Sequence, residues 1–192
     1  MLDLNGYKLV LGSASPRRKA LLEEMGFSFV QRTVDLDEIP AEGLSPNAVA
    51  EDLARQKAEA IEITEGELLL CADTIVVVDH DLLAKPADRE EALSMLRRIS
   101  GRSHQVITGV CLRSLGRSIC GHALTKVHFR ELKESEMEYY IDEFQPFDKA
   151  GAYGIQEWIG MIGVDRIKGD YYNVVGLPCA LVYDLLQRFP EE

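Results

Sequence analysis

The chain has 192 residues, of which 46% are hydrophobic and 28% are charged, a composition typical of a globular protein that can bury a core without disulfides or a structural metal. This length favours one domain over residues 1–192, either simple or two-lobed. The formal net charge of -11 at pH 7 disfavours binding to nucleic acid and to anionic membranes, because like charges repel, whereas a local basic pocket can still bind a small anion.

Hydrophobic periodicity and turn residues predict alternating strands and helices along the chain. Ser15-Pro16 and Ser45-Pro46 each combine an N-cap residue with a proline at the first helical position, which is typical of a helix start. In chain order, the predicted elements are a strand over 7–11, a helix from 16 to near 26, a strand over 27–35, a helix from 46, a strand over 68–78, a hairpin turn at 79–81, a helix over 88–100, an antiparallel strand pair over 104–113 and 117–132, and helices over 134–144 and 178–189. This order predicts an α/β or mixed α+β fold around a twisted mixed sheet flanked by helices.

The four cysteines form no CxxC pair, which favours free thiols in a reducing compartment. The N-terminus shows no basic segment followed by an apolar one, so no signal peptide is expected. Since no apolar run approaches the roughly 20 residues that span a bilayer, a cytoplasmic protein without a membrane partner is expected.

Residues 12–19, Gly-Ser-Ala-Ser-Pro-Arg-Arg-Lys, lie where a predicted strand meets a helix. Small residues let the backbone approach a ligand closely, and a helix N-terminus offers N–H groups and a partial positive charge. Arg17 and Arg18 add guanidinium groups that suit phosphate oxygens. The alternative is a capped helix with a solvated basic first turn, but cations there oppose the helix dipole unless an anion compensates them. The segment therefore predicts phosphate binding, although it is neither a Walker A loop nor a GxGxxG motif.

Asp73 and Thr74 interrupt the apolar run over 68–78. A carboxylate inside such a strand is unfavourable unless it is paired, hydrogen-bonded or bound to a metal, so Asp73 is a candidate metal ligand or general base. The alternative is an aspartate solvated at a strand end. Lys57 and Lys85, each taken alone, are more typical of solvated surface lysines. They become candidate site residues only in combination with the other motifs.

Residues 147–156, Phe-Asp-Lys-Ala-Gly-Ala-Tyr-Gly-Ile-Gln, predict a tight loop that leads into a strand, or else an ordinary turn. Gln156 at its end is a candidate for recognising a base edge, because an amide both donates and accepts hydrogen bonds.

Asp35, Asp37 and Glu38 form an acidic cluster that could bind a divalent cation through oxygens or could equally be a solvated loop.

Five segments occur in an order and at a spacing that resemble the Maf family of nucleoside triphosphate pyrophosphatases. They are GSASPRR at 12–18, ARQKA at 54–58, ADTIV at 72–76, AKP at 84–86 and DKAGAYGIQ at 148–156. The agreement extends to SGRSHQVITGV at 100–110 and VVGLP at 174–178. The resemblance implies a two-lobed mixed α/β fold similar to that of inosine triphosphate pyrophosphatases, with the active site in the central cleft.

The resemblance also implies roles for individual residues. Asp73 is expected to be the catalytic carboxylate and a metal ligand, and Asp37 or Glu38 corresponds to an acidic residue of the metal site. Residues implied to help select the base are Arg18, Thr74 and Gln156. Residues implied to surround the phosphates are Ser13, Arg17, Lys57 and Lys85.

The expected reaction is hydrolysis of a nucleoside triphosphate between the α- and β-phosphates, with Mg²⁺ or Mn²⁺ bridging phosphate oxygens and carboxylates. The form of residues 148–156 resembles the branch that acts on dTTP and UTP, although Glu157-Trp158 stand where a glycine is expected. The alternatives are a non-catalytic nucleotide-binding regulator of cell division, a family member with another base preference, and a phosphatase that releases orthophosphate. A homodimer is expected only because it is the commonest soluble assembly.

Overall fold

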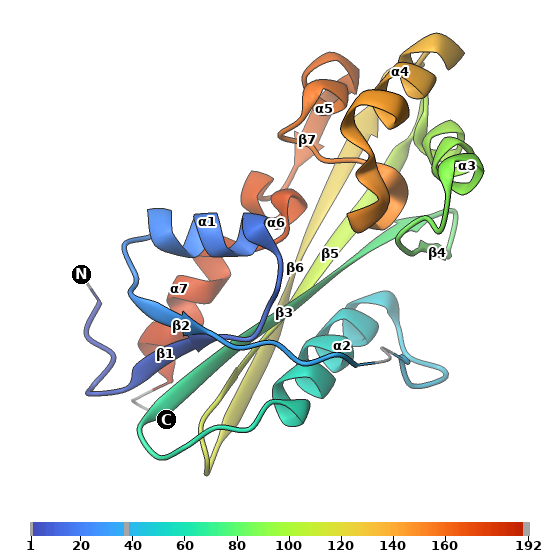
Figure 1. Ribbon diagram of the computed structural model, residues 1–192. Helices are drawn as coiled ribbons and strands as arrows, with labels where there is room; N and C mark the ends of the chain where they lie inside the picture. The colour runs from blue at the N-terminus through green and yellow to red at the C-terminus, as the bar shows by residue number, and fades with distance from the viewer. Residues whose placement is uncertain (1, 37–38, 190–192) are drawn as a thin grey trace. The chain divides into compact units, whose positions relative to one another are not determined.

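Seven strands form one mixed sheet in the computed structural model, which describes residues 2–36 and 39–189 (Figure 1). The strands run in the order β2-β1-β3-β5-β6-β7, and β4 pairs with β3. β1 is parallel to β2 and β3, whereas β4 is antiparallel to β3 and β7 is antiparallel to β6. The strand bounds are Lys8–Leu11 for β1, Phe29–Gln31 for β2, Glu67–Val78 for β3, Asp81–Leu83 for β4, Ser103–Arg113 for β5, Ser118–Phe129 for β6 and Val164–Lys168 for β7. The predicted mixed α/β fold is therefore confirmed.

The helices begin where the sequence provides capping residues. Ser15 and Ser45 both have extended backbone angles, and their hydroxyl groups accept hydrogen bonds from the amides of Arg18 and Ala48 at 3.4 Å. Such caps satisfy N–H groups that have no partner within a helix. The helix bounds are Pro16–Glu24 for α1, Pro46–Ala60 for α2, Arg89–Ile99 for α3, Glu134–Phe144 for α4, Trp158–Gly163 for α5, Tyr171–Val175 for α6 and Cys179–Arg188 for α7.

Two parts of the predicted pattern are wrong. The strand predicted over 27–35 is only three residues long, because β2 covers Phe29–Gln31 alone. The loop over 147–156 does not lead into a strand but forms two short 3₁₀ turns, η1 (Pro146–Asp148) and η2 (Ala150–Ala152), ahead of α5. Gly151 in η2 has a φ of 71°, a left-handed conformation that ends helical and extended structure at this point.

The chain divides into two compact units, and β3, β5 and β6 contribute residues to both. The first unit comprises Met1–Asp73, Thr108–Ala123 and Gly176–Glu192. Within it, α2 and α7 cover opposite faces of the sheet (Figure 1). A side chain at Gly109 would collide with the backbone of Ala50 in α2, whereas one at Gly121 would meet Leu181 and Leu185 of α7.

The second unit comprises Thr74–Ile107 and Leu124–Val175 and has its own apolar core. The aromatic rings of Tyr153 and Phe129 meet edge to face at 5.1 Å, and the Tyr153 hydroxyl lies 2.7 Å from Nε2 of buried His104. These contacts anchor the loop around Tyr153 to the sheet. No helix in the described ranges is long and apolar enough to cross a membrane.

Candidate active site

The junction between β1 and α1 is organised around the hydroxyl of Ser13, which is 8% exposed. Its oxygen accepts hydrogen bonds from the Ser15 amide at 3.2 Å and from Nη1 of Arg18 at 3.3 Å. The Ser13 carbonyl accepts a 2.6 Å hydrogen bond from Nε2 of Gln31. Because the oxygen already accepts two hydrogen bonds, the hydroxyl proton of Ser13 is the part that can be donated to a ligand.

Gly12 serves packing rather than ligand approach. A Cβ at this position would lie 2.3 Å from Sγ of Cys71 and 2.9 Å from Cδ1 of Ile61. The Gly12 amide donates a 2.8 Å hydrogen bond to the carbonyl of Leu70, which continues the β1–β3 pairing to the end of β1. The missing side chain of Gly12 therefore lets β1 approach β3 closely.

Arg18 is held in place by the chain segment that precedes α7. Its Nε donates a 2.8 Å hydrogen bond to the carbonyl of Gly176, in the VVGLP segment. With Nη1 bound to Ser13, the guanidinium plane is fixed at two points. Arg17 precedes it in the first turn of α1 and is half-buried. Two arginines at a helix N-terminus form a site of positive potential that suits a phosphate group.

Lys57 and Asp73 form a buried ion pair. Asp73 lies within β3 and is 7% exposed, and Nζ of Lys57, from the last turn of α2, contacts its Oδ1. The side chains of Lys57 and Asp73 are 15% and 10% exposed. The alternative of a solvated strand-end aspartate is therefore wrong. The lysine contact is made to Oδ1 of Asp73, so the carboxylate carries its charge beside the ammonium group.

Three predicted residues belong to the second unit, and their segments meet there. Thr74 is half-buried in β3, and Lys85 is exposed just beyond β4. Gly151 of the η2 turn donates a 3.1 Å hydrogen bond to the carbonyl of Ala84, and a Cβ on Gly151 would touch the side chain of Val76 at 3.1 Å. The loop that leads to Gln156 therefore packs against both the strand of Thr74 and the segment of Lys85.

The amide of Gln156 combines a packed nitrogen with an unsatisfied oxygen. Its Nε2 would lie 2.9 Å from a Cβ built on Gly154, so the side chain folds back over that glycine. Its Oε1 is buried and has no hydrogen-bond partner in the part of the chain that the structure describes. A buried amide oxygen without a partner is unfavourable and uncommon, which is expected where a ligand supplies the missing donor.

Sequence reasoning did not find the residues that support this loop. Lys149 is 9% exposed, and its Nζ lies 2.7 Å from Oδ1 of Asp148 and 3.1 Å from Oε1 of Glu157. The hydroxyl of buried Tyr140 donates to Oε2 of Glu157 and accepts a 3.0 Å hydrogen bond from the Gly154 amide. The one signal in the sequence was Glu157 itself, which departs from the pattern expected after Gln156.

The predicted metal ligands are only partly described. Asp37 and Glu38 lie outside the described residues. Among the others, no group of three or more histidine, cysteine, aspartate and glutamate side chains could hold a metal ion. A single carboxylate such as that of Asp73 is compatible with Mg²⁺, because this ion commonly takes one or two protein carboxylates and completes its shell with water and substrate phosphates.

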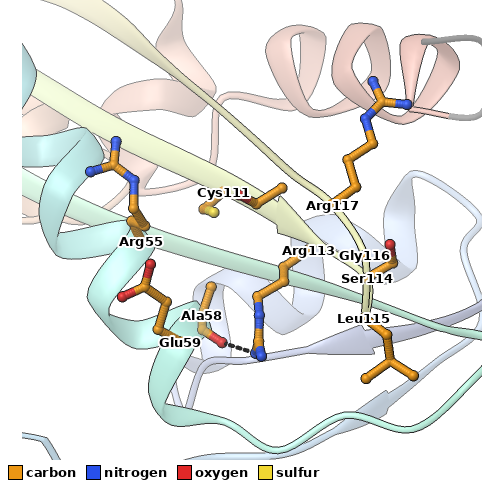
Figure 2. Close-up of a pocket in the computed structure, with 10 residues that line it drawn as sticks. Arg55, Ala58, Glu59, Cys111, Arg113, Ser114, Leu115, Gly116 and Arg117 are labelled. Atoms are coloured by element: carbon orange, nitrogen blue, oxygen red, sulfur yellow. Dashed lines mark hydrogen bonds between the residues drawn. The ribbon is translucent and has the colours of Figure 1, made fainter.

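A separate cavity of about 220 Å³ lies in the first unit, and neither Ser13 nor Asp73 is among the residues that line it (Figure 2). It is lined by the end of α2 and the β5–β6 hairpin. Arg113 donates hydrogen bonds of 2.5 and 3.0 Å to the carbonyls of Ala58 and Ile61, which closes the C-terminal end of α2. This arginine therefore has a structural role.

Within the first unit, a basic helix N-terminus and a buried lysine–aspartate pair are typical of an α/β protein that binds a phosphorylated ligand. A family model for Maf-like proteins matches residues 8–189, and the chain belongs to this family. A Porphyromonas gingivalis protein named dTTP/UTP pyrophosphatase is 48% identical over 100% of this chain and 99% of its own length. A Bacteroides fragilis protein of the same name is 47% identical over 98% of this chain and 99% of its own length. A crystal structure of a nucleoside-triphosphatase / dITP/XTP pyrophosphatase from Mycobacterium abscessus aligns with a TM-score of 0.38 and 18% identity over 65% of this chain and 75% of that chain.

Proposed function

We propose that this protein hydrolyses dTTP and UTP to the nucleoside monophosphate and pyrophosphate. The observation that carries the proposal is the buried pair of Lys57 and Asp73, which places a carboxylate, paired with an ammonium group, inside an otherwise apolar strand. Support for the substrate comes from relatives that are 47% identical over nearly their whole length and are named dTTP/UTP pyrophosphatase.

The phosphates are the most highly charged part of the substrate, and basic side chains compensate them. In the first unit, Arg17 and Arg18 lie in the first turn of α1, and the Ser13 hydroxyl can donate to a phosphate oxygen. Lys57 adds an ammonium group beside Asp73. Lys85 of the second unit is solvent-exposed, and its ammonium group can bind a phosphate oxygen. These groups stabilise the negative charge that develops on the departing pyrophosphate.

Asp73 acts on the water that attacks the α-phosphorus. The Lys57 ammonium holds Oδ1 in place, so that Oδ2 can accept a proton from the attacking water or orient it. The same carboxylate would hold Mg²⁺ or Mn²⁺, and Asp37 and Glu38 remain predicted ligands. When bound, such a cation neutralises phosphate charge and polarises the phosphoryl oxygens.

Base selection belongs to Gln156 and Thr74. An amide can donate to a carbonyl and accept from the imide N–H, which matches the edge that thymine and uracil share. The buried Oε1 of Gln156, which lacks a partner among the residues that the structure describes, is the acceptor in this scheme, with Nε2 as the donor. Arg18, in the first unit, is the third residue that the proposal assigns to base selection. The proposal also includes a cytoplasmic location and a homodimeric assembly.

The proposal is tested with a panel of all common ribo- and deoxyribonucleoside triphosphates and 7-methyl-GTP, with and without Mg²⁺ or Mn²⁺. Pyrophosphate and orthophosphate are quantified separately. Metal-dependent pyrophosphate release from dTTP and UTP is the expected result. Orthophosphate release would indicate a phosphatase instead, and binding without turnover would indicate a non-catalytic nucleotide-binding protein.

A further inference from the structure

Glu157 lies at the centre of a hydrogen-bond network beside Gln156. One carboxylate oxygen is 3.1 Å from the ammonium of Lys149, and the other accepts the hydroxyl proton of Tyr140. Tyr140 is fully buried, and Lys149 is nearly so. An ion pair and a charge-assisted hydrogen bond in such surroundings hold a side chain in one orientation.

The same residue fixes the backbone on both sides of Gln156. The Glu157 amide donates a 3.0 Å hydrogen bond to the Gly154 carbonyl, and the Glu157 carbonyl accepts from the amides of Gly160 and Met161 at 3.0 and 3.1 Å. The Gly154 amide is held in turn by the Tyr140 hydroxyl at 3.0 Å. Gln156 is therefore enclosed between two backbone positions that the network holds.

The side chains of Gln156 and Glu157 also pack on one surface. A Cβ on Gly154 would lie 2.8 Å from Cδ of Glu157 and 2.9 Å from Nε2 of Gln156. Both side chains therefore cover Gly154 and lie close to each other. Movement of the Glu157 carboxylate would open space into which the Gln156 amide can rotate.

We infer that Glu157 is a positioning residue that orients the Gln156 amide and thereby sets the base preference of the enzyme. This inference rests on the proposed function, because it assigns a specificity role within the same reaction. Glu157 does not touch the reacting phosphorus in this scheme. Its effect is on which base is accepted rather than on the chemical step.

The test compares Glu157→Gln with the parent protein in kcat/KM for dTTP and for dCTP. The expected result is a loss of roughly tenfold in the dTTP-to-dCTP ratio, about the effect of one misplaced hydrogen bond. The loss should arise mainly from a higher KM for dTTP, with kcat less affected. Tyr140→Phe should shift the ratio in the same direction, because it also releases the Glu157 carboxylate.

Glu143→Gln is the matched control, since Glu143 is exposed in α4 and takes no part in the network. An unchanged ratio in both Glu157→Gln and Tyr140→Phe would overturn the inference, as would an equal loss for every nucleotide. Pyrophosphate release by the parent protein distinguishes a failure of the proposed function from a failure of the role assigned to Glu157. If the parent hydrolyses no triphosphate, the proposed function fails; if it does and the ratio stays constant, only the role of Glu157 fails.

A second and independent observation concerns two cysteines on the face of the β5–β6 hairpin that α2 covers. The Ser114 amide donates to the Arg117 carbonyl at 2.8 Å, and the Phe129 amide donates to the Arg102 carbonyl at 3.1 Å. Counting inward from either hydrogen bond gives the same register. This register sets Cys111 directly opposite Cys120, at a non-hydrogen-bonded position of the antiparallel pair.

Cysteines at such a position are close enough to be joined. Opposite Cα atoms at non-hydrogen-bonded positions are about 4.5 Å apart, which lies within the range that a disulfide spans. Both thiols are free in this structure. Cys111 lines the cavity of about 220 Å³ together with Arg55, and Cys120 is the more exposed of the two cysteines (Figure 2).

The surroundings also favour the thiolate of Cys120. The Cys111 thiol and the nearby guanidinium of Arg55 lower the pKa of Cys120 against the opposing effect of burial, whereas the pKa of Cys111 is raised. Cys120 is half-buried, whereas Cys111 is buried. Cys120 is therefore suited to react first, and Cys111 is placed to react second.

We propose that Cys111 and Cys120 form a reversible disulfide by exchange with a small-molecule disulfide such as glutathione disulfide. The Cys120 thiolate attacks one sulfur of the disulfide, forms a mixed disulfide and releases one thiolate. Cys111 then loses its proton to solvent, attacks Sγ of Cys120 and releases the second thiolate. The protein dithiol is oxidised, and one glutathione disulfide is reduced to two glutathione molecules.

The full-length protein is incubated with glutathione disulfide, alkylated and digested without reduction for mass spectrometry. A Cys111–Cys120 linked peptide is expected, and Cys111→Ser should stop at a glutathione adduct on Cys120. Cys179→Ser is the control and should leave the link unchanged. A stable adduct on Cys120 in the parent protein, a link from Cys111 to Cys71, or no reaction at either cysteine would each overturn the proposal.

Discussion

Lys57 and Asp73 are joined by an ion pair that links the last turn of α2 to the interior of β3. Both side chains are largely withdrawn from water, so each charge depends on the other. Removing one member of a buried pair leaves an uncompensated charge, which is far less favourable than replacing both. The pair therefore has measurable consequences for turnover and for stability.

Asp73→Asn should lower kcat by roughly 10² or more, because the amide keeps the size of the carboxylate but cannot accept the proton of the attacking water. The measurement is pyrophosphate release at saturating dTTP. Nucleotide binding, measured by calorimetry, should persist in this variant. Asp142→Asn, which removes an exposed partner of Arg89, is the control and should keep its activity. Near-parental turnover by Asp73→Asn would remove Asp73 from the catalytic role.

Lys57→Met and Asp73→Asn should each lower the free energy of unfolding by roughly 2 kcal/mol or more, because each leaves a poorly solvated charge without its partner. The double variant should be destabilised by at least 1 kcal/mol less than the sum of the single variants. Denaturant unfolding of the four proteins measures this coupling. Turnover should stay low in the double variant, and strict additivity would indicate that the two charges do not interact.

Gln156→Ala should reduce discrimination against purine triphosphates more than it reduces turnover of dTTP. The reason is that the buried Oε1, which has no partner within the described residues, is the proposed acceptor for the base edge. The ratio of kcat/KM for dTTP to that for dATP is the measurement. An equal loss for all bases would assign Gln156 a structural role.

Gly12→Ala should destabilise the protein by about 1–3 kcal/mol, because the added methyl group would lie 2.3 Å from Sγ of Cys71. Cys71→Ala removes that sulfur, so the Gly12→Ala/Cys71→Ala protein should be more stable than the sum of the single effects implies. Denaturant midpoints of the three variants and the parent test this relation. Failure of Cys71→Ala to relieve the effect would locate the conflict at Ile61.

Local signals were sufficient for much of the fold. Ser15-Pro16 and Ser45-Pro46 predicted their helices because an N-cap and a proline act within one turn. The hairpin turn after β3 was predicted by its residues, and Asp79 and His80 indeed have positive φ values of 49° and 76°. By contrast, α5, β7 and α6 have only six, five and five residues, too few to show a period.

The candidate site was predicted as a set of residues but not as a set of contacts. Asp73 and Lys57 were both identified, yet their pairing depends on how α2 packs on β3, which no local pattern encodes. The hydrogen bond from Arg18 to the Gly176 carbonyl joins positions 158 residues apart, a separation that local patterns do not reveal. The network of Tyr140, Lys149 and Glu157 was missed for the same reason: Glu157 departs from the expected pattern, but nothing in its own segment indicates that Tyr140 and Lys149 are its partners.

His104 should make stability depend on pH. Burial lowers its pKa to about 4, whereas the unfolded chain has a histidine pKa near 6.5. The unfolded state therefore binds a proton below about pH 6.5 that the folded state does not accept until about pH 4. The contribution of neutral His104 is fully present above pH 6.5 and is lost as the pH falls, by up to about 1.4 kcal/mol per pH unit.

Urea unfolding from about pH 7 to about pH 5 should show a shallower loss of stability for His104→Gln than for the parent. His80→Asn, in the exposed turn, should match the parent, and parallel pH profiles for parent and His104→Gln would show that His104 is not the group responsible.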